Sequence, residues 1–240
     1  MGLFDKQHLK IVRFLENTAT LAVVHDGSKA ASPWPTDARR NMVMAGDTAV
    51  ELGNPGDASV SFLYWVEEPG SLTNGRITVI GPDIPESAGS RLPFGKVAII
   101  GATGFDAENS LHRYRELESV RYALHLKGYM MRAASGYGRE WSRVSREAHQ
   151  GGFSFAILGK ALVDSYLELD YVHSVELIFV TGTHERVLWL SQTAGEVDAI
   201  VGAMHKIMEE SLFDCETCDY SVICEETAGL RSMHRAWGGK

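Results

Sequence analysis

The chain has 240 residues, of which 45% are hydrophobic and 22% charged, and this composition excludes a disordered or collagen-like protein. Its formal net charge of -8 disfavours nucleic-acid binding, because that affinity comes from Lys and Arg side chains that neutralise phosphates. No apolar run reaches the roughly 18 to 20 residues of a membrane-spanning helix, and the first residues lack the apolar core of a signal peptide. We therefore expect a cytoplasmic protein without a membrane span that binds no nucleic acid.

The first part of the chain predicts a helix, a strand and then an irregular connection. Residues 7–24 begin with apolar residues at helical spacing and end in the apolar run Leu21–Val24. From Asp26 to Asp57 the chain is rich in Gly, Pro, Ser, Asp and Asn, so we predict an irregular connection there. Residues 1–46 are therefore predicted as an N-terminal helix with an irregular extension.

The middle of the chain, residues 47–194, is predicted to form the main α/β domain. Ser59–Val66 and Arg76–Ile80 are rich in β-branched and aromatic residues, and the turn sequence Thr73-Asn74-Gly75 between them predicts a hairpin. Further buried strands are predicted at Lys96–Ile100 and Val175–Val180, and helices at Ala107–Leu126, Glu140–His149 and Ala156–Leu169. Because strands and helices interleave irregularly, the expected class is α+β or α/β, with a mixed sheet and flanking helices.

Residues 195–240 are predicted as a helix followed by a cysteine-rich tail. All three cysteines of the chain lie here, and an odd number this close together cannot form a disulfide framework. Cys215 and Cys218 form a Cys-x2-Cys pair that can turn two thiolates toward one metal, and Cys224 with His234 can complete four ligands suited to zinc or iron. The alternatives are that the cysteines are small buried residues and that His234 is a solvated side chain.

Four stretches of this sequence recur in the same order in one known protein family. They are Asp47–Gly53 (DTAVELG), Asn74–Ile84 (NGRITVIGPDI), Ser90–Gly95 (SRLPFG) and Trp141–Ala148 (WSRVSREA). From about Asp47 onward the chain resembles acetyl-CoA synthase, the β subunit of the carbon monoxide dehydrogenase/acetyl-CoA synthase complex. The resemblance implies a fold similar to the middle domain of that family, followed by the start of its cluster-binding region.

The resemblance also implies a cofactor. In that family four cysteines hold a [4Fe-4S] cluster, and two further cysteines of a C-terminal domain complete a nickel pair. Cys215, Cys218 and Cys224 match the first three cluster cysteines, and His234 stands at the interval of the fourth. A [4Fe-4S] cluster is therefore the expected cofactor, and zinc is the alternative. Since the sequence stops at Lys240, before the family's nickel ligands, we expect no nickel and no complete acetyl-CoA synthesis in this chain alone.

A coenzyme A site is implied as well. The family's middle domain is associated with coenzyme A through arginines near a tryptophan. Here Arg139, Trp141 and Arg143 form a basic and aromatic stretch, with Arg146 following, and Arg132 stands at about the place of the family's tryptophan. Arginine side chains suit phosphate geometry. The alternative is a solvated helix face with Trp141 in the core.

These observations leave three functional hypotheses open. The first is a non-catalytic or partial subunit that carries a [4Fe-4S] cluster in a one-carbon or acyl-CoA complex, for electron transfer or structural support. The second is an acyl or methyl transferase that acts on coenzyme A together with partner subunits. The third is a zinc-stabilised interaction module. The sequence identifies no catalytic residue.

Overall fold

Two β-sheets organise the chain in its computed structural model, which describes residues 2–27, 34–37, 42–68, 70–134, 138–209 and 218–238. The large sheet has five strands in the order β1-β4-β9-β6-β3, and the small sheet has four in the order β5-β2-β8-β7. The large sheet consists of β1 (Ala22–Asp26), β4 (Arg76–Ile80), β9 (Val172–Val180), β6 (Phe94–Ala102) and β3 (Ser59–Val66). The small sheet consists of β5 (Arg91–Leu92), β2 (Thr48–Leu52), β8 (Arg139–Ser145) and β7 (Tyr129–Ala134).

Seven α-helices are described around these sheets, together with short 3-10 turns at Ala19–Leu21, Ala45–Asp47 and Ile84–Glu86. The helices are α1 (Asp5–Thr18), α2 (Ser110–Val120), α3 (Arg146–Gln150), α4 (Phe155–Leu167), α5 (His184–Glu209), α6 (Ser221–Glu226) and α7 (Ala228–Gly238). None of these described helices combines the length and the apolar character needed to cross a membrane.

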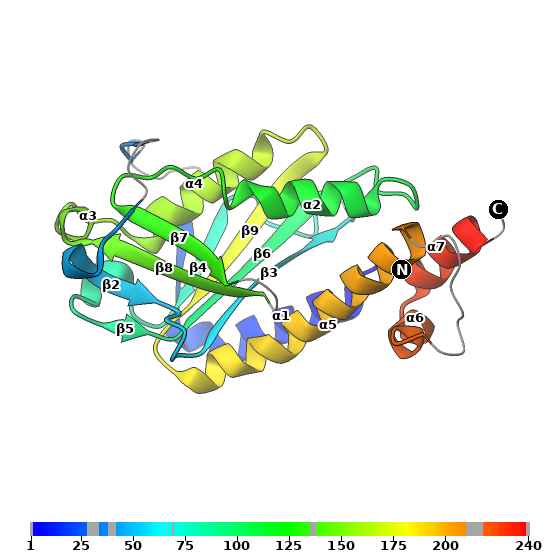
Figure 1. Cartoon of the computed structure of the whole chain (residues 1–240), viewed down its shortest axis with the longest axis horizontal. Coiled ribbons are helices and arrows are strands. Elements are labelled where there is room, and N and C mark those ends of the chain that lie inside the picture. Colours follow the sequence, from blue (N-terminus) through cyan, green and yellow to red (C-terminus); the bar gives the residue numbers. More distant parts are fainter. Residues whose placement is uncertain are drawn as a thin grey trace.

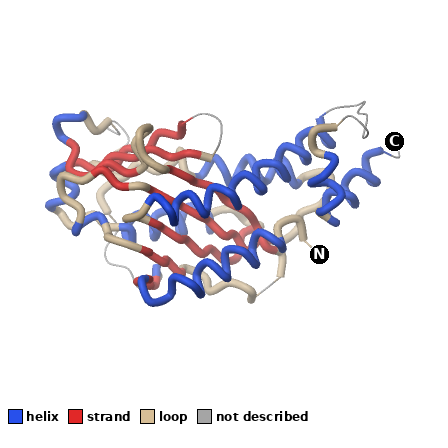
Figure 2. The backbone as a smooth tube through the Cα atoms, turned by 90° about the horizontal axis from the view of Figure 1, so that it is seen from below, coloured by secondary structure: helices blue, strands red, loops and turns tan. Residues whose placement is uncertain are grey.

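Helices cover both faces of the large sheet (Figure 1). On one face lie α1 and α5, which are joined by Phe14 stacking on Trp189 with 4.8 Å between the ring centroids. On the other face lies α4, whose Phe155 ring lies 4.7 Å from the Phe179 ring of β9. The small sheet lies at one end of the molecule, and α5 extends to α6 and α7 at the other end (Figures 1 and 2). The mixed sheets and flanking helices confirm the predicted α+β architecture, while the similarity to one particular domain stays a prediction.

The predicted hairpin between Ser59–Val66 and Arg76–Ile80 is wrong. Both stretches are strands, but β3 pairs in parallel with β6, and β4 lies between β1 and β9. All eight residues of β3 are buried, which is typical of an enclosed strand that pairs with a distant segment. The turn Thr73-Asn74-Gly75 before β4 is hydrogen-bonded to β9, because the Val175 backbone N–H donates to Asn74 Oδ1 at 3.1 Å.

Two other elements also differ from the predictions. A helix is predicted over Glu140–His149, but Glu140–Ser145 belong to β8 and only the following Arg146–Gln150 are helical. The even-numbered residues of β8 are buried and the odd-numbered ones are not, which is the two-residue period of a strand. In addition, β2 lies inside the stretch 26–57 that is predicted to be irregular.

The N-terminal residues share the core of the rest of the chain. β1 pairs antiparallel with β4, from Ala22 opposite Ile80 to Asp26 opposite Arg76. At the other predicted boundary, α5 runs without a break from His184 to Glu209, through residues 194 and 195. The division into three parts stays a prediction.

The turn Ile80–Ile84, the most specific part of the family resemblance, connects the large sheet to α4. Gly81 has φ of 105°, and a Cβ atom there would lie 2.4 Å from the carbonyl oxygen of Thr181, so only glycine fits. Asp83 Oδ1 accepts hydrogen bonds from the backbone N–H groups of Ile84 at 2.6 Å and Phe155 at 2.9 Å. Backbone geometry therefore explains this motif without a ligand.

Candidate functional sites

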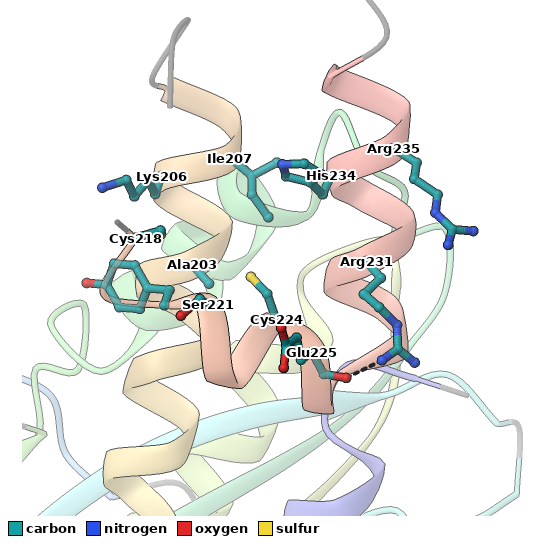
Figure 3. A pocket seen from close by; sticks show the side chains of 11 residues that line it. Ala203, Lys206, Ile207, Cys218, Ser221, Cys224, Glu225, Arg231, His234 and Arg235 are labelled. Carbon is teal, nitrogen blue, oxygen red and sulfur yellow. Dashed lines mark hydrogen bonds between the residues drawn. The ribbon is translucent and has the colours of Figure 1, made fainter. Parts of the chain in front are cut away.

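A cavity of about 290 Å³ lies between the C-terminal half of α5, α6 and α7 (Figure 3). Cys218 before α6, Cys224 within α6 and His234 on α7 all line it. Figure 3 shows the Cys224 Sγ atom and the His234 ring directed into the space between α5 and α7, whereas Cys218 lies on the side of Lys206. The fold thus brings three of the four predicted metal ligands to one cavity. The fourth, Cys215, lies outside the described residues.

The donor types of this cavity suit a soft metal, because thiolate and imidazole are the ligands that zinc, copper(I) and iron–sulfur centres use. Within the described ranges, however, no three His, Cys, Asp or Glu side chains gather as ligands of one ion. The cavity therefore presents suitable donors on its walls without collecting them at one point. The rest of the wall is formed by Ala203, Lys206, Ile207, Tyr220, Ser221, Glu225, Arg231 and Arg235.

The predicted coenzyme A residues share one face of the small sheet, which we call the arginine face. Arg139, Trp141 and Arg143 alternate outward along β8, and Arg132 of β7 lies directly opposite Trp141. Arg91 of β5 joins them, because Glu51 of β2 lies opposite Arg91 on one side and Arg143 on the other. The arginine face is therefore made of Arg91, Arg132, Arg139, Trp141 and Arg143. It belongs to a sheet, and not to the helix face considered from the sequence.

Glu51 is the buried centre of the arginine face and was missed by the sequence analysis. Its side chain receives four contacts, from Trp141 Nε1 and Arg143 Nε to Oε1, both at 2.9 Å, and from Asn54 Nδ2 at 2.8 Å and Arg91 Nε at 3.2 Å to Oε2. The Arg143 guanidinium also lies over the Trp141 ring, 4.5 Å from its centroid. Burial raises the pKa of the Glu51 carboxyl, but the hydrogen bonds from Arg143, Asn54 and Trp141 outweigh this effect, so the pKa lies below its ordinary value.

The remaining predicted arginines are exposed and less constrained. Arg139 Nη2 donates to the backbone carbonyl of Asp57 at 3.3 Å. Arg146 stands in α3 and lines a separate polar cavity of about 340 Å³ together with Lys127 and Asp47. Arg146 therefore does not join the arginine face.

A buried ion pair that the sequence analysis also missed joins the two sheets. Lys96 Nζ of β6 donates to Glu140 Oε2 of β8, and their side chains are 7% and 0% exposed. Ser61 Oγ donates to the same carboxylate at 3.1 Å, and Ser142 Oγ and Tyr129 Oη lie 3.3 and 3.4 Å from its other oxygen. Lys96, the charged residue of the otherwise apolar stretch Phe94–Ala102, was the feature that could have indicated a buried ion pair.

These observations define an α+β protein with a thiol- and imidazole-lined cavity and a basic sheet face. The sequence model of the CO dehydrogenase/acetyl-CoA synthase complex beta subunit family matches residues 39–186, which is more than half of the chain. The chain therefore belongs to this family, as the resemblance predicted.

One curated relative is the acetyl-CoA decarbonylase/synthase complex subunit beta of Methanopyrus kandleri, which is 30% identical over 142 residues. The match covers 58% of this chain and 29% of the relative, so the chain spans less than a third of that subunit. The family match includes the arginine face and the Lys96–Glu140 pair but ends at residue 186, before Cys218, Cys224 and His234. Family membership thus rests on residues 39–186, and the cavity lies beyond them.

Proposed function

We propose that this chain serves a one-carbon or acyl-CoA complex as a partial subunit that holds a thiolate-ligated metal centre, foremost a [4Fe-4S] cluster, in the cavity between α5 and α7. Its role there is electron transfer or structural support. The observation that carries the proposal is that Cys218, Cys224 and His234 come from separate segments and line the same cavity. The relative from Methanopyrus kandleri is named as a subunit of a complex, which supports a role within an assembly.

The donor types around this cavity fit an iron–sulfur cluster and a zinc ion alike, because both groups are held by thiolate and imidazole ligands. We place the cluster first because the family resemblance implies it, and metal analysis separates the two. Bound here, a cluster supplies one-electron transfer. The residues of this chain donate sulfur and nitrogen to it, and an imidazole from His234 in place of a thiolate raises its reduction potential.

Metal analysis of protein prepared without oxygen tests this proposal. We expect bound iron in the wild-type protein, and we expect Cys218→Ser and Cys224→Ser each to lose most of it, because a hydroxyl is a poor substitute for thiolate toward iron. Ser221→Ala is the matched control, since Ser221 lines the same cavity without a soft donor atom.

The opposite results are equally clear. Unchanged metal content in Cys218→Ser, Cys224→Ser and Cys215→Ser would exclude the metal centre. Stoichiometric zinc without iron would instead favour the zinc-stabilised interaction module.

A second candidate function, acyl or methyl transfer on coenzyme A with partner subunits, is favoured by the arginine face. Four arginines and one tryptophan share this face, and the Glu51 carboxylate lies among them. Titration with coenzyme A at low salt should show binding that weakens about tenfold in Arg139→Ala and in Arg143→Ala, since a charge-assisted hydrogen bond contributes about 1.5 to 3 kcal/mol. No binding at millimolar coenzyme A would remove this candidate.

A further inference from the structure

We propose that Glu51 is a positioning residue that holds Arg91 and Arg143 as a paired guanidinium site for a phosphorylated small molecule. The proposal rests on the second candidate function, in which the arginine face binds an anion, and it adds the residue that builds the site and the strand, β5, that completes it. Neither Glu51 nor Arg91 belongs to the arginine and tryptophan stretch that the sequence singled out.

The geometry of the two ion pairs carries the inference. Glu51 contacts both arginines through their Nε atoms, Arg143 at 2.9 Å and Arg91 at 3.2 Å. A guanidinium has five N–H donors in one plane, so a contact at Nε leaves the Nη groups for another acceptor. Arg143 Nη1 donates to the Val43 carbonyl at 3.4 Å, so the Nη2 group of Arg143 remains for a ligand. Among the described residues, Arg91 contacts Glu51 through Nε, so both of its Nη groups remain for a ligand. The Arg91 side chain is 71% exposed.

The carboxylate that anchors these arginines is itself fixed. Glu51 is 6% exposed, and Asn54 and Trp141 each donate a hydrogen bond to it. It lies on the central one of three adjacent strands, directly opposite Arg91 on β5 and Arg143 on β8. Two guanidinium groups from the strands on either side of β2 are thereby tied to one carboxylate before any ligand arrives, which lowers the entropic cost of binding.

The charge balance points to an anionic ligand. One carboxylate is sufficient to neutralise one arginine, whereas Glu51 faces Arg91 and Arg143 together, and Arg132 and Arg139 add two more cations to the same face. Guanidinium groups recognise phosphate oxygens through paired N–H donors. Two guanidinium groups that share one carboxylate, each with an Nη group that Glu51 does not use, suit a phosphate monoester or a phosphoanhydride.

Titration with inorganic pyrophosphate at low salt tests this positioning role. We expect the wild-type protein to bind, and we expect Arg91→Gln and Arg143→Gln each to weaken binding about tenfold, as the loss of a charge-assisted hydrogen bond predicts. Glu51→Gln should also weaken binding several-fold, although it removes a negative charge. Charge alone predicts the opposite sign, because deleting a carboxylate beside an anion site should strengthen anion binding.

Controls separate orientation from folding and from general charge. Glu16→Gln makes the same charge change at an exposed position of α1 and should leave the affinity for pyrophosphate unchanged. Glu51→Asp keeps the carboxylate and should recover part of the affinity lost in Glu51→Gln. Arg91→Lys keeps the charge without the Nε anchor, so it should weaken binding as Arg91→Gln does, and it gives an answer even if Glu51→Gln fails to fold.

The outcomes also distinguish this proposal from the function on which it rests. Equal or tighter pyrophosphate binding by folded Glu51→Gln, or unchanged binding by Arg91→Lys, would overturn the positioning role of Glu51. Either result would still support anion binding by the arginine face. No binding of pyrophosphate by the wild-type protein at millimolar concentration would overturn both.

Discussion

Replacing Lys96 by Met should destabilise the protein by about 3 to 5 kcal/mol, because the substitution leaves a fully buried carboxylate without its counter-charge. The Glu140 side chain is 0% exposed, and Lys96 is the cation that donates to it. Hydrogen bonds from Ser61 and Ser142 remain in the variant, but neutral donors offset only part of the cost of burying a charge. Urea unfolding at pH 7 measures this difference in the free energy of unfolding.

Two further variants test the explanation. Lys6→Met removes an exposed ion pair, in which Lys6 and Glu226 are 48% and 57% exposed, and should change stability by less than about 1 kcal/mol. The double variant Lys96→Met/Glu140→Leu replaces the buried pair by apolar side chains and should recover most of the lost stability. A Lys96→Met variant as stable as Lys6→Met would show that the buried pair does not contribute as described.

The same pair should make the protein sensitive to acid. Burial raises the pKa of the Glu140 carboxyl, but the Lys96 ammonium, with smaller contributions from Arg121 and Ser61, outweighs this effect, so the pKa in the folded protein lies below the ordinary value of 4.5. The ionised carboxylate therefore contributes stability above pH 4.5, and this contribution is lost as the pH falls through the pKa of the folded state. Stability measured between pH 7 and pH 3 should fall less steeply in Lys96→Met/Glu140→Leu than in the wild-type protein.

Replacing Phe155 by Ala should cost about 3 to 5 kcal/mol, the range for truncating a fully buried aromatic side chain. The Phe155 ring lies 5.9 Å from the Phe94 ring and 4.7 Å from the Phe179 ring, so it joins the first turn of α4 to two strands of the large sheet. The backbone N–H of Phe155 also donates to Asp83 in the turn Ile80–Ile84. A cavity at this position would weaken the contact between that helix and the sheet.

Thermal and urea unfolding of matched variants check this expectation. Phe155→Leu, which keeps most of the apolar volume, should lose clearly less stability than Phe155→Ala. Leu188→Ala truncates a side chain that is 60% exposed and should lose little. Equal losses in Phe155→Ala and Leu188→Ala would contradict the central position given to Phe155.

The sequence by itself determined those properties that local spacing encodes. The helix at the N-terminus, the buried runs that became β3, β4, β6 and β9, and the mixed α+β class all follow from periodicity and composition. Motifs in order along the chain indicated the family, which the match over residues 39–186 shows. Cys218, Cys224 and His234 line one cavity, but whether they bind a metal stays a prediction. Periodicity and composition can be read locally because they depend on which side of an element is apolar.

Only the tertiary structure decided which distant segments meet. Periodicity cannot identify the partner of a strand, so β3 and β4 were predicted as a hairpin although β9 and β6 separate them in the sheet. Whether Glu140 was buried could not be known until Lys96 of a distant strand was placed beside it. Likewise, Arg91 joins Arg143 only because β2 lies between their strands and carries Glu51 to both. The physical reason is that strand pairing and buried ion pairs gain their free energy from contacts between residues far apart in the chain, and local sequence does not record those contacts.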